Sequence, residues 1–461
     1  MPKSALKFRL SAISAQGLAD TITRLPVLLA LSGLAILHTA TLMDLPQRAY
    51  THDFSVFYAS AIALRHGLNP YTVNLAPIGR RLGFYIGALL HSTDTPTALL
   101  FFIPFSLATP PVAHAIWIDL SAAALVLALL LLIQPKYSGL DTRLAFAIAA
   151  LALLYAPITE NFLFSQRQTL ILLLLVLVMR ALDRGYEAAA GMFLGLAVAY
   201  RVFPLLIAGY FIIRSQWRPL IFMCLGFAIV VAVTVAVLGI PLCASYPTGM
   251  RFAMTASWHD PTDVALHGFL LRLFSYTGLQ TNNRLQVLQR ITIASAQIVI
   301  VALAAWPTYQ RRLRTGFDRR TYGLWVAAAL VLSPLSWIHY MVLLLIPFVE
   351  IASSAQKHES STRAIWAAIV SYVLIVPGRG LREVVVGPIW WAYGVKYLAE
   401  GSSVALLLGF LAAEWLATDK TDSMEADKLR ELSPTFAPSN SCASQGVSIR
   451  ASNGSDAVIE L

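Results

Sequence analysis

Two charged residues in the sequence could take part in chemistry at a membrane. Asp53 heads the amphipathic run FSVFYASAIALR, and its carboxylate could act as a general base that removes a proton from a hydroxyl group. Arg201 interrupts an apolar segment, where a charge costs about 2.5 to 3.5 kcal/mol on insertion scales, and its guanidinium could bind a lipid phosphate. Both have structural alternatives, because Asp53 suits a helix N-cap and Arg201 could reach the interface or pair with a carboxylate.

Two motifs place further polar side chains beside long apolar runs. SQRQT contains Gln166 and Gln168, whose amides could hydrogen-bond sugar hydroxyls or could only cap a helix. SPLSWIHY contains Trp337 and His339. The tryptophan could equally be an interfacial aromatic, and a lone histidine is more often structural. These four residues are candidate substrate-binding groups only in combination with the two charges.

The segment around Asp53 completes the candidate set. His52, Tyr58 and Tyr71 lie in THDFSVFYASAIALRHGLNPY, and we treat them as candidate substrate-binding neighbours of the carboxylate. The three cysteines show no metal-site or disulfide spacing, and the sequence contains no glycine-rich phosphate loop or nucleotide fingerprint. We therefore expect no metal ion, no cofactor and no soluble nucleotide donor.

These groups must be positioned by a chain that is mostly apolar. Of its 461 residues, 57% are hydrophobic and 13% are charged, whereas an average soluble domain has about 25% charged residues. The apolar runs at 25–43, 112–133 and 219–240 each approach the roughly 20 residues that a helix needs to cross a bilayer. The composition predicts an all-α polytopic membrane protein. We expect one membrane domain, 1–417, followed by a disordered cytoplasmic tail, 418–461.

The basic residues predict the topology. The formal charge of +10 comes from Lys and Arg in short connectors between apolar runs, so we assign these connectors to the cytoplasm and need no nucleic-acid partner. This arrangement predicts about twelve spans and both termini in the cytoplasm. It leaves on the extracytoplasmic side the segments 44–111, 159–167, 242–289, 334–339 and 378–394.

Two segments do not fit simple spans. Residues 95–111, TPTALLFFIPFSLATPP, are too few and too proline-rich for a complete membrane span. We therefore predict that they form a re-entrant or interfacial helix, within a long and structured first outer loop, 44–111. Residues 188–213 lie between two basic connectors that are both assigned to the cytoplasm, and they are too few for two complete spans. Two half-helices that meet near Arg201 and Pro204 would let the chain return to the same side. Irregular backbone at membrane depth is tolerated where it is buried in protein or lines a cavity, so Arg201 is expected to line one.

Taken in order, five motifs resemble those of glycosyltransferase family 87, which comprises multispanning GT-C transferases that use polyprenyl-phosphate mannose. They span residues 50–350 of the sequence. The motifs are DFSVFYASAIALRHGLNPY, TPTALLFFIPFSLATPP, SQRQT, GMFLGLAVAYRVFP and SPLSWIHYMVLLLIP. The resemblance implies a GT-C-like bundle of membrane helices, an α-1,2-mannosyltransferase-like activity and a location in a bacterial inner membrane.

The resemblance also implies roles for single residues. Asp53 corresponds to the catalytic aspartate of the family's first extracytoplasmic loop. The family motif Gly-Gln-x-Asn keeps its glutamine as Gln166, with Ser165 and Gln168 in place of the glycine and the asparagine. Arg201 stands where a Lys is common, an exchange that keeps the charge but changes the geometry offered to a phosphate.

Together, these observations predict an inverting glycosyltransferase whose site faces away from the cytoplasm. Asp53 would deprotonate an acceptor hydroxyl on a lipid or glycan, while Arg201, with His339, would hold the phosphate of a polyprenyl-phosphate sugar. Mannose is the expected sugar. Two alternatives stay open: an enzyme on the same scaffold that uses another polyprenyl-phosphate sugar, and a lipid or substrate transporter, which would also place charges at broken helices.

Overall fold

The computed structural model is mainly helical in the residues that it describes, with turns and short connectors between the helices. Within the described residues the only β-type pairing is an isolated antiparallel bridge between Asp263 and Trp337. This confirms the predicted all-α fold class. The predicted outer segment 378–394 and the predicted tail 418–461 lie outside the described residues. Those residues are 23–48, 52–83, 86, 90–257, 263, 265–276, 283–357, 365, 366, 368–370 and 372.

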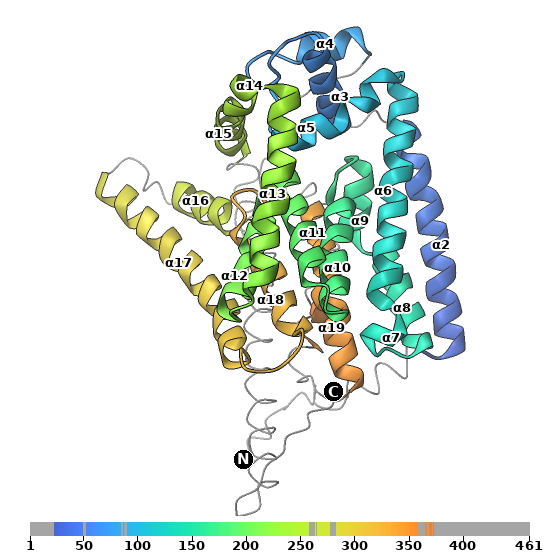
Figure 1. Cartoon of the computed structure of the whole chain (residues 1–461). Helices are drawn as coiled ribbons and strands as arrows, with labels where there is room; N and C mark the ends of the chain where they lie inside the picture. Colours follow the sequence, from blue (N-terminus) through green and yellow to red (C-terminus); the bar gives the residue numbers. More distant parts are fainter. Residues whose placement is uncertain are drawn as a thin grey trace, which may run out of the picture. The chain divides into compact units, whose positions relative to one another are not determined.

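Long apolar helices alternate with short, broken ones along the chain (Figure 1). The first part of the chain forms α2 (Leu25–Arg48), α3 (His52–Arg65), α4 (Ala76–Arg81), α5 (Pro96–Phe102), η2 (Pro104–Leu107), α6 (Pro110–Ile133), α7 (Pro135–Ser138), α8 (Thr142–Leu153) and α9 (Ala156–Leu163). The middle forms α10 (Gln168–Asp183), α11 (Glu187–Tyr200), η3 (Phe203–Ile207), α12 (Ala208–Ile213), α13 (Trp217–Leu238), α14 (Ile240–Ala244) and α15 (Tyr246–Ser257). The last described part forms α16 (Leu266–Tyr276), α17 (Asn283–Gln310), α18 (Arg319–Leu332), η5 (Ile338–Leu344) and α19 (Leu345–Gln356).

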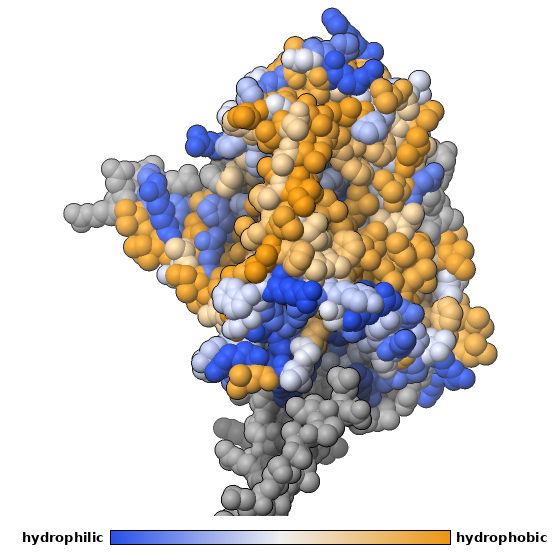
Figure 2. Space-filling view, in the orientation of Figure 1, coloured by the Kyte–Doolittle hydropathy of each residue, from blue (hydrophilic) through white to orange (hydrophobic). Residues whose placement is uncertain are grey.

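Four helical stretches in the described part of the chain are long and apolar enough to cross a membrane. They are Pro110–Ile133, Trp217–Leu238, Gln286–Gln310 and Ile338–Gln356, and the bent pair α8–α9 would make a fifth. Apolar side chains cover the lateral face around α13, between hydrophilic side chains at both ends (Figure 2). The protein is therefore membrane-embedded in character. The total of about twelve spans stays a prediction.

The two segments that did not fit simple spans are both broken. Residues 95–111 form α5 and then η2, which Pro104 begins, and α5 packs against α3 and α13. Residues 188–213 form α11, η3 and α12, with Arg201 in an extended conformation between the first two (φ −146°, ψ 131°). Pro204 lies in the first turn of η3, where its missing N–H group is harmless. The chain therefore breaks at Arg201, where the sequence indicated.

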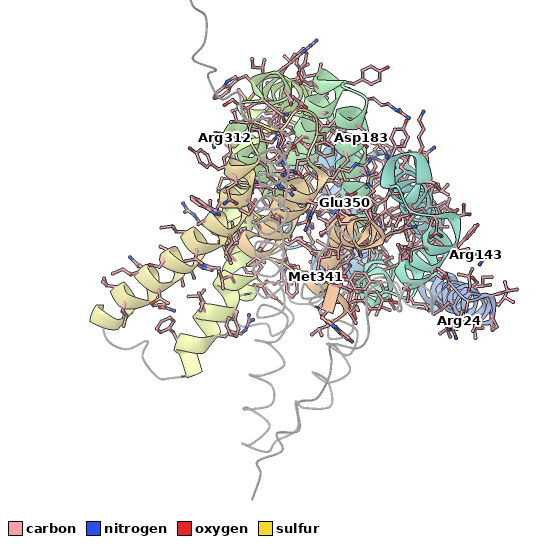
Figure 3. All side chains as sticks on the ribbon, turned by 90° about the horizontal axis from the view of Figure 1, so that it is seen from below. Arg24, Arg143, Asp183, Arg312, Met341 and Glu350 are labelled. Carbon is pink, nitrogen blue, oxygen red and sulfur yellow. The ribbon has the colours of Figure 1, made fainter. Side chains whose placement is uncertain are left out.

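The basic connectors gather at one end of the molecule. Arg214 donates hydrogen bonds to the carbonyl groups of Arg311, Arg314 and Gly316, which joins the α12–α13 connector to the α17–α18 connector. From below, Figure 3 shows Asp183 and Glu350 near the middle of this end and Arg24, Arg143 and Arg312 around it. The positive-inside rule therefore predicts that this end faces the cytoplasm.

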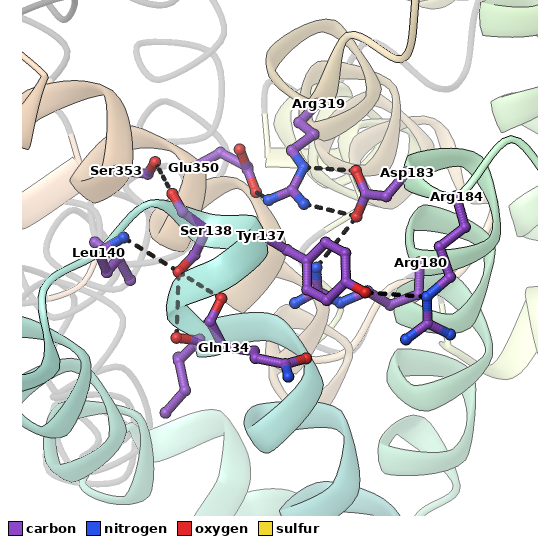
Figure 4. Close-up of polar contacts among 11 residues, drawn as sticks. Gln134, Tyr137, Ser138, Leu140, Arg180, Asp183, Arg184, Arg319, Glu350 and Ser353 are labelled. Atoms are coloured by element: carbon purple, nitrogen blue, oxygen red, sulfur yellow. Dashed lines mark hydrogen bonds and ion pairs between the residues drawn. The ribbon is translucent and has the colours of Figure 1, made fainter.

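A polar network ties the helices together at this basic end. Asp183 accepts hydrogen bonds from Arg180 (3.1 Å) and from Arg319 (2.6 Å), and Arg319 also contacts Glu350 (3.4 Å). Nearby, Arg184 donates a hydrogen bond to the Tyr137 hydroxyl (Figure 4). Buried ion pairs contribute little net stability, but each partner satisfies the other's charge. The network therefore connects α10, α18 and α19 at the basic end of the molecule.

Glycines let α11 and α13 pack closely, and this contact makes the first test of the fold. An added Cβ at Gly195 would lie 2.4 Å from the Met223 carbonyl oxygen and 2.7 Å from the Phe227 nitrogen, both of them backbone atoms. We expect Gly195→Ala to destabilise the protein by about 1 to 3 kcal/mol, because the helices must move apart. Thermal unfolding in detergent measures this. Gly33→Ala on α2 is the control, since nothing lies within 4 Å of its added Cβ.

Candidate active site

A cavity of about 1150 Å³ lies among α3, α15, the turn between α9 and α10, the α11–η3 break and the segment before η5. Five of the residues singled out in the sequence line it: Asp53, Gln166, Arg201, Trp337 and His339. They come from four separate parts of the chain. The structure therefore brings the carboxylate and the guanidinium into one cavity, as the sequence analysis expected.

Asp53 lies in the first turn of α3, where the positive end of the helix dipole favours a carboxylate. Gln166 donates a hydrogen bond from Nε2 to Asp53 Oδ2 across 113 residues of sequence. The opposite atom of this amide, Oε1, is buried and has no hydrogen-bond partner among the described residues. Gln166 can therefore orient the carboxylate while its free oxygen accepts a hydrogen bond from a sugar hydroxyl.

An irregular turn between α9 and α10 aims Gln166 at Asp53. Ser165 adopts φ +50°, in the left-handed region where glycine is favoured. His114 Nε2 lies 2.8 Å from the Ser165 hydroxyl oxygen, and Trp117 donates its indole N–H to the Ser165 carbonyl oxygen (2.7 Å). The turn is therefore held from α6 by two buried side chains.

Arg201 enters the cavity from the break between α11 and η3. The Thr95 hydroxyl donates a hydrogen bond to the Tyr200 carbonyl oxygen (3.0 Å), which fixes the end of α11 against the start of α5. The Arg201 Cζ atom lies 5.2 Å from the centroid of the Tyr340 ring, a cation–π contact. Its Nε atom is buried without a hydrogen-bond partner in the part of the chain described. The guanidinium thus retains capacity for an anion.

Trp337 and His339 line the cavity at the start of η5, beside the Tyr340 ring that Arg201 contacts. The Asp263 carboxylate accepts a hydrogen bond from the Ser336 backbone N–H (2.9 Å), and the Asp263 main chain forms the bridge with Trp337. This contact holds the segment before η5. His339 is 6% exposed, and its Nε2 atom has no hydrogen-bond partner within the described ranges.

Four other candidates are not among the residues that line the cavity. The Tyr58 hydroxyl donates to the Ala108 carbonyl oxygen (2.7 Å) and the Tyr71 hydroxyl to the Asp94 carbonyl oxygen (2.7 Å). Gln168 is fully buried at the start of α10. The side chain of His52 lies outside the described residues. Tyr58 and Tyr71 therefore hold parts of residues 44–111 together beside the cavity, and their proposed contact with substrate has no geometric support.

Several polar residues of the cavity were not predicted from the sequence. Asp94 and Arg167 form a buried ion pair in its wall, although Arg167 lies in the SQRQT motif, between the two glutamines that were considered. A charge within a motif that precedes a long apolar run was the signal available. Burial raises the pKa of the Tyr246 hydroxyl to about 12, so this lining residue stays protonated and can donate a hydrogen bond at neutral pH. Glu160 and Arg251 also line the cavity.

The arrangement can accept a proton and bind an anion in the same space. Three carboxyl groups and three guanidinium groups line the cavity, together with apolar side chains of η3 and α15. Within the described ranges, no group of three or more His, Cys, Asp or Glu side chains could hold a metal ion. A ligand with a phosphate, hydroxyl groups and an apolar tail would match all three kinds of lining.

Two comparisons with known proteins agree on one family. A model of glycosyltransferase family 87 matches residues 93–334, which include Arg201 but neither Asp53 nor His339. A Mycobacterium tuberculosis (strain ATCC 25618 / H37Rv) protein is 25% identical over 329 aligned residues, covering 64% of this chain and 69% of that protein. That relative is named polyprenol-phosphate-mannose-dependent alpha-(1-2)-phosphatidylinositol mannoside mannosyltransferase.

Proposed function

This chain belongs to glycosyltransferase family 87, and from that premise we propose that it transfers mannose from a polyprenyl-phosphate donor to a lipid or glycan hydroxyl on the extracytoplasmic face. One observation carries the proposal. Asp53 and Arg201 line the same cavity although 148 residues separate them in sequence, the difference between positions 201 and 53. A base and a phosphate-binding cation in one space are what this transfer requires.

The proposed reaction is a single displacement. Asp53 takes the proton of the acceptor hydroxyl while the hydroxyl oxygen forms a bond to the anomeric carbon. The bond from that carbon to the phosphate oxygen breaks, and its electron pair leaves with the polyprenyl phosphate. Arg201 stabilises this charge as it develops. Attack opposite the leaving group inverts the anomeric configuration, so a β-linked donor gives an α-linked product.

The relative's name supports the choice of donor and acceptor class. It names polyprenol-phosphate mannose as the donor and a phosphatidylinositol mannoside as the acceptor of that protein. Membership in a transferase family also favours an enzyme over the transporter considered from the sequence alone. The positive-inside rule supports the extracytoplasmic side, because it assigns to the cytoplasm the basic end of the molecule, where the Asp183 network lies.

A transfer assay with a panel of donors tests the proposed function. Membranes that contain the wild-type protein are incubated with radiolabelled polyprenyl-phosphate mannose, polyprenyl-phosphate glucose or a nucleotide mannose, and labelled lipid and glycan products are separated. We expect transfer from polyprenyl-phosphate mannose and none from the nucleotide sugar. Transfer from the glucose donor alone would show that the transferred sugar is glucose and not mannose. Transfer from the nucleotide donor alone would refute the lipid-linked donor. Membranes without the protein are the control.

A further inference from the structure

Arg167 is a buried charge in the cavity wall to which neither the sequence analysis nor the proposed reaction gives a role. Its side chain is 1% exposed, at the turn that leads into α10. One nitrogen, Nη2, donates to Asp94 Oδ1, and the guanidinium packs 4.4 Å from the centroid of the Phe57 ring. A charge buried this deeply must be paired, and Asp94 provides that partner.

The guanidinium retains two donor atoms after it has paired with Asp94. Its Nε and Nη1 atoms are buried and have no hydrogen-bond partner among the described residues. The Arg167 Cζ atom lies 5.6 Å from the centroid of the Tyr200 ring, and the Tyr200 hydroxyl is likewise buried without a hydrogen-bond partner among the described residues. A buried polar group without a partner is unusual in a native protein, and a ligand is one of its explanations.

Asp94 holds Arg167 from a well-anchored position. The Asp94 carbonyl oxygen accepts a hydrogen bond from the Tyr71 hydroxyl. The next residue, Thr95, caps α5 by accepting from the Ala98 backbone N–H (3.2 Å), and its hydroxyl donates to the Tyr200 carbonyl oxygen. Asp94 is therefore fixed on both sides. This restricts the guanidinium to one orientation at the cavity.

Arg167 and Arg201 act on the same small region. Both guanidinium groups interact electrostatically with Tyr340 and with His339. Both also interact with Tyr246, and Arg167 itself lines the cavity. Arg167 and Arg201 both line the cavity, and their directed N–H donors suit phosphate oxygens, so one anion in this cavity can be bound by both.

We propose that Arg167 is a second ligand of the donor phosphate, directed by Asp94 as a positioning residue, and that it acts chiefly as the phosphate departs. This inference rests on the proposed function. In the donor, a sugar phosphodiester, the phosphate carries one negative charge. The departing polyprenyl monophosphate carries about −1.5 to −2 at neutral pH. A second cation therefore binds the transition state and the product more strongly than the substrate, so its loss lowers kcat more than it raises KM.

The double substitution Asp94→Asn with Arg167→Gln tests this role without leaving a buried charge unpaired. Two neutral amides can keep a hydrogen bond in the same place, so we expect folding to be retained, as checked by thermal unfolding. Binding of undecaprenyl monophosphate and of undecaprenol to the purified protein is then measured. We expect the double variant to lose on the order of 10- to 100-fold in affinity for the monophosphate and nothing for the alcohol.

Two further variants make the test selective. Arg184→Gln removes an exposed guanidinium at the other end of α10 and should bind the monophosphate like the wild type. Arg167→Lys keeps the charge beside Asp94 but not the directed pair of free N–H donors. With its fold intact, it should bind the monophosphate less tightly and show a lower kcat with a smaller change in KM.

The outcomes separate this inference from the proposed function. If the wild type binds the monophosphate no better than the alcohol, the lipid-phosphate donor is wrong and the inference fails with it. If the wild type prefers the monophosphate and the folded double variant does so equally, the proposed function stands and Arg167 is only a structural partner of Asp94. Should the double variant not fold, a wild-type kcat in Arg167→Lys would overturn the proposal.

Discussion

Replacing Asp53 by Asn is expected to lower sugar transfer by about 10²- to 10⁴-fold, because general-base catalysis contributes that much to the rate. The Asn side chain has nearly the same shape, and its amide oxygen can still accept the hydrogen bond from Gln166. The side chain at position 53 therefore keeps its place, but it can no longer accept a proton from the acceptor hydroxyl. The measurement is kcat for transfer from the donor that the panel assay identifies.

Asp119→Asn provides the matched control for this substitution. Asp119 is exposed on α6 and does not line the cavity, so the same chemical change there should leave kcat unaltered. Wild-type transfer by Asp53→Asn would remove Asp53 from the mechanism. An equal loss in both variants would point to a general effect on folding, which thermal unfolding of the two proteins would reveal.

Replacing Arg201 by Ala is expected to lower kcat by about 10²- to 10³-fold, the usual effect of removing one preorganised group that stabilises developing charge. Its guanidinium packs beside Tyr340 and keeps an unpartnered Nε atom in the described structure. Arg201 lies outside regular helix, so its removal should leave the fold intact. Steady-state kinetics with varied donor concentration measures kcat and KM together.

Arg201→Lys is the charge-conserving variant for this test, and Arg218→Ala is its control. Lysine keeps the charge, so this variant should recover a large part of the lost activity. Arg218 is an exposed arginine at the start of α13, outside the cavity, and its removal should have no effect on transfer. Unchanged kcat and donor KM in Arg201→Ala would exclude the phosphate role.

The helical architecture was largely predictable because it depends on local properties of the chain. Runs of apolar residues near bilayer length predict membrane helices whatever they pack against, and α6 and α13 follow these runs closely. The break at Arg201 was predictable for the same reason, since Pro204 cannot continue a helix. The number of spans was less accessible, because several predicted segments are short or bent, as α8 and α9 are.

The candidate site was accessible in part. Asp53 and Arg201 stood out because each is a charge in apolar surroundings, a pattern that needs no knowledge of the fold. The contact between Gln166 and Asp53 could not be predicted from either motif alone. Tyr71 was assigned to substrate, and its hydroxyl instead supports Asp94. A single sequence does not reveal whether a polar side chain turns into a cavity or towards the backbone of a neighbouring segment.

The sequence by itself determined the class of protein, the placement of its long apolar helices and the two charges that matter most to the proposed reaction. Only the tertiary structure decided the ion pair of Asp94 with Arg167 and the hydrogen bond from the Ser336 backbone N–H to the Asp263 carboxylate, each across 73 residues. The physical reason is that such contacts depend on how helices rotate and approach one another. Close packing such as that at Gly195 sets those positions, and local hydrophobicity does not encode them.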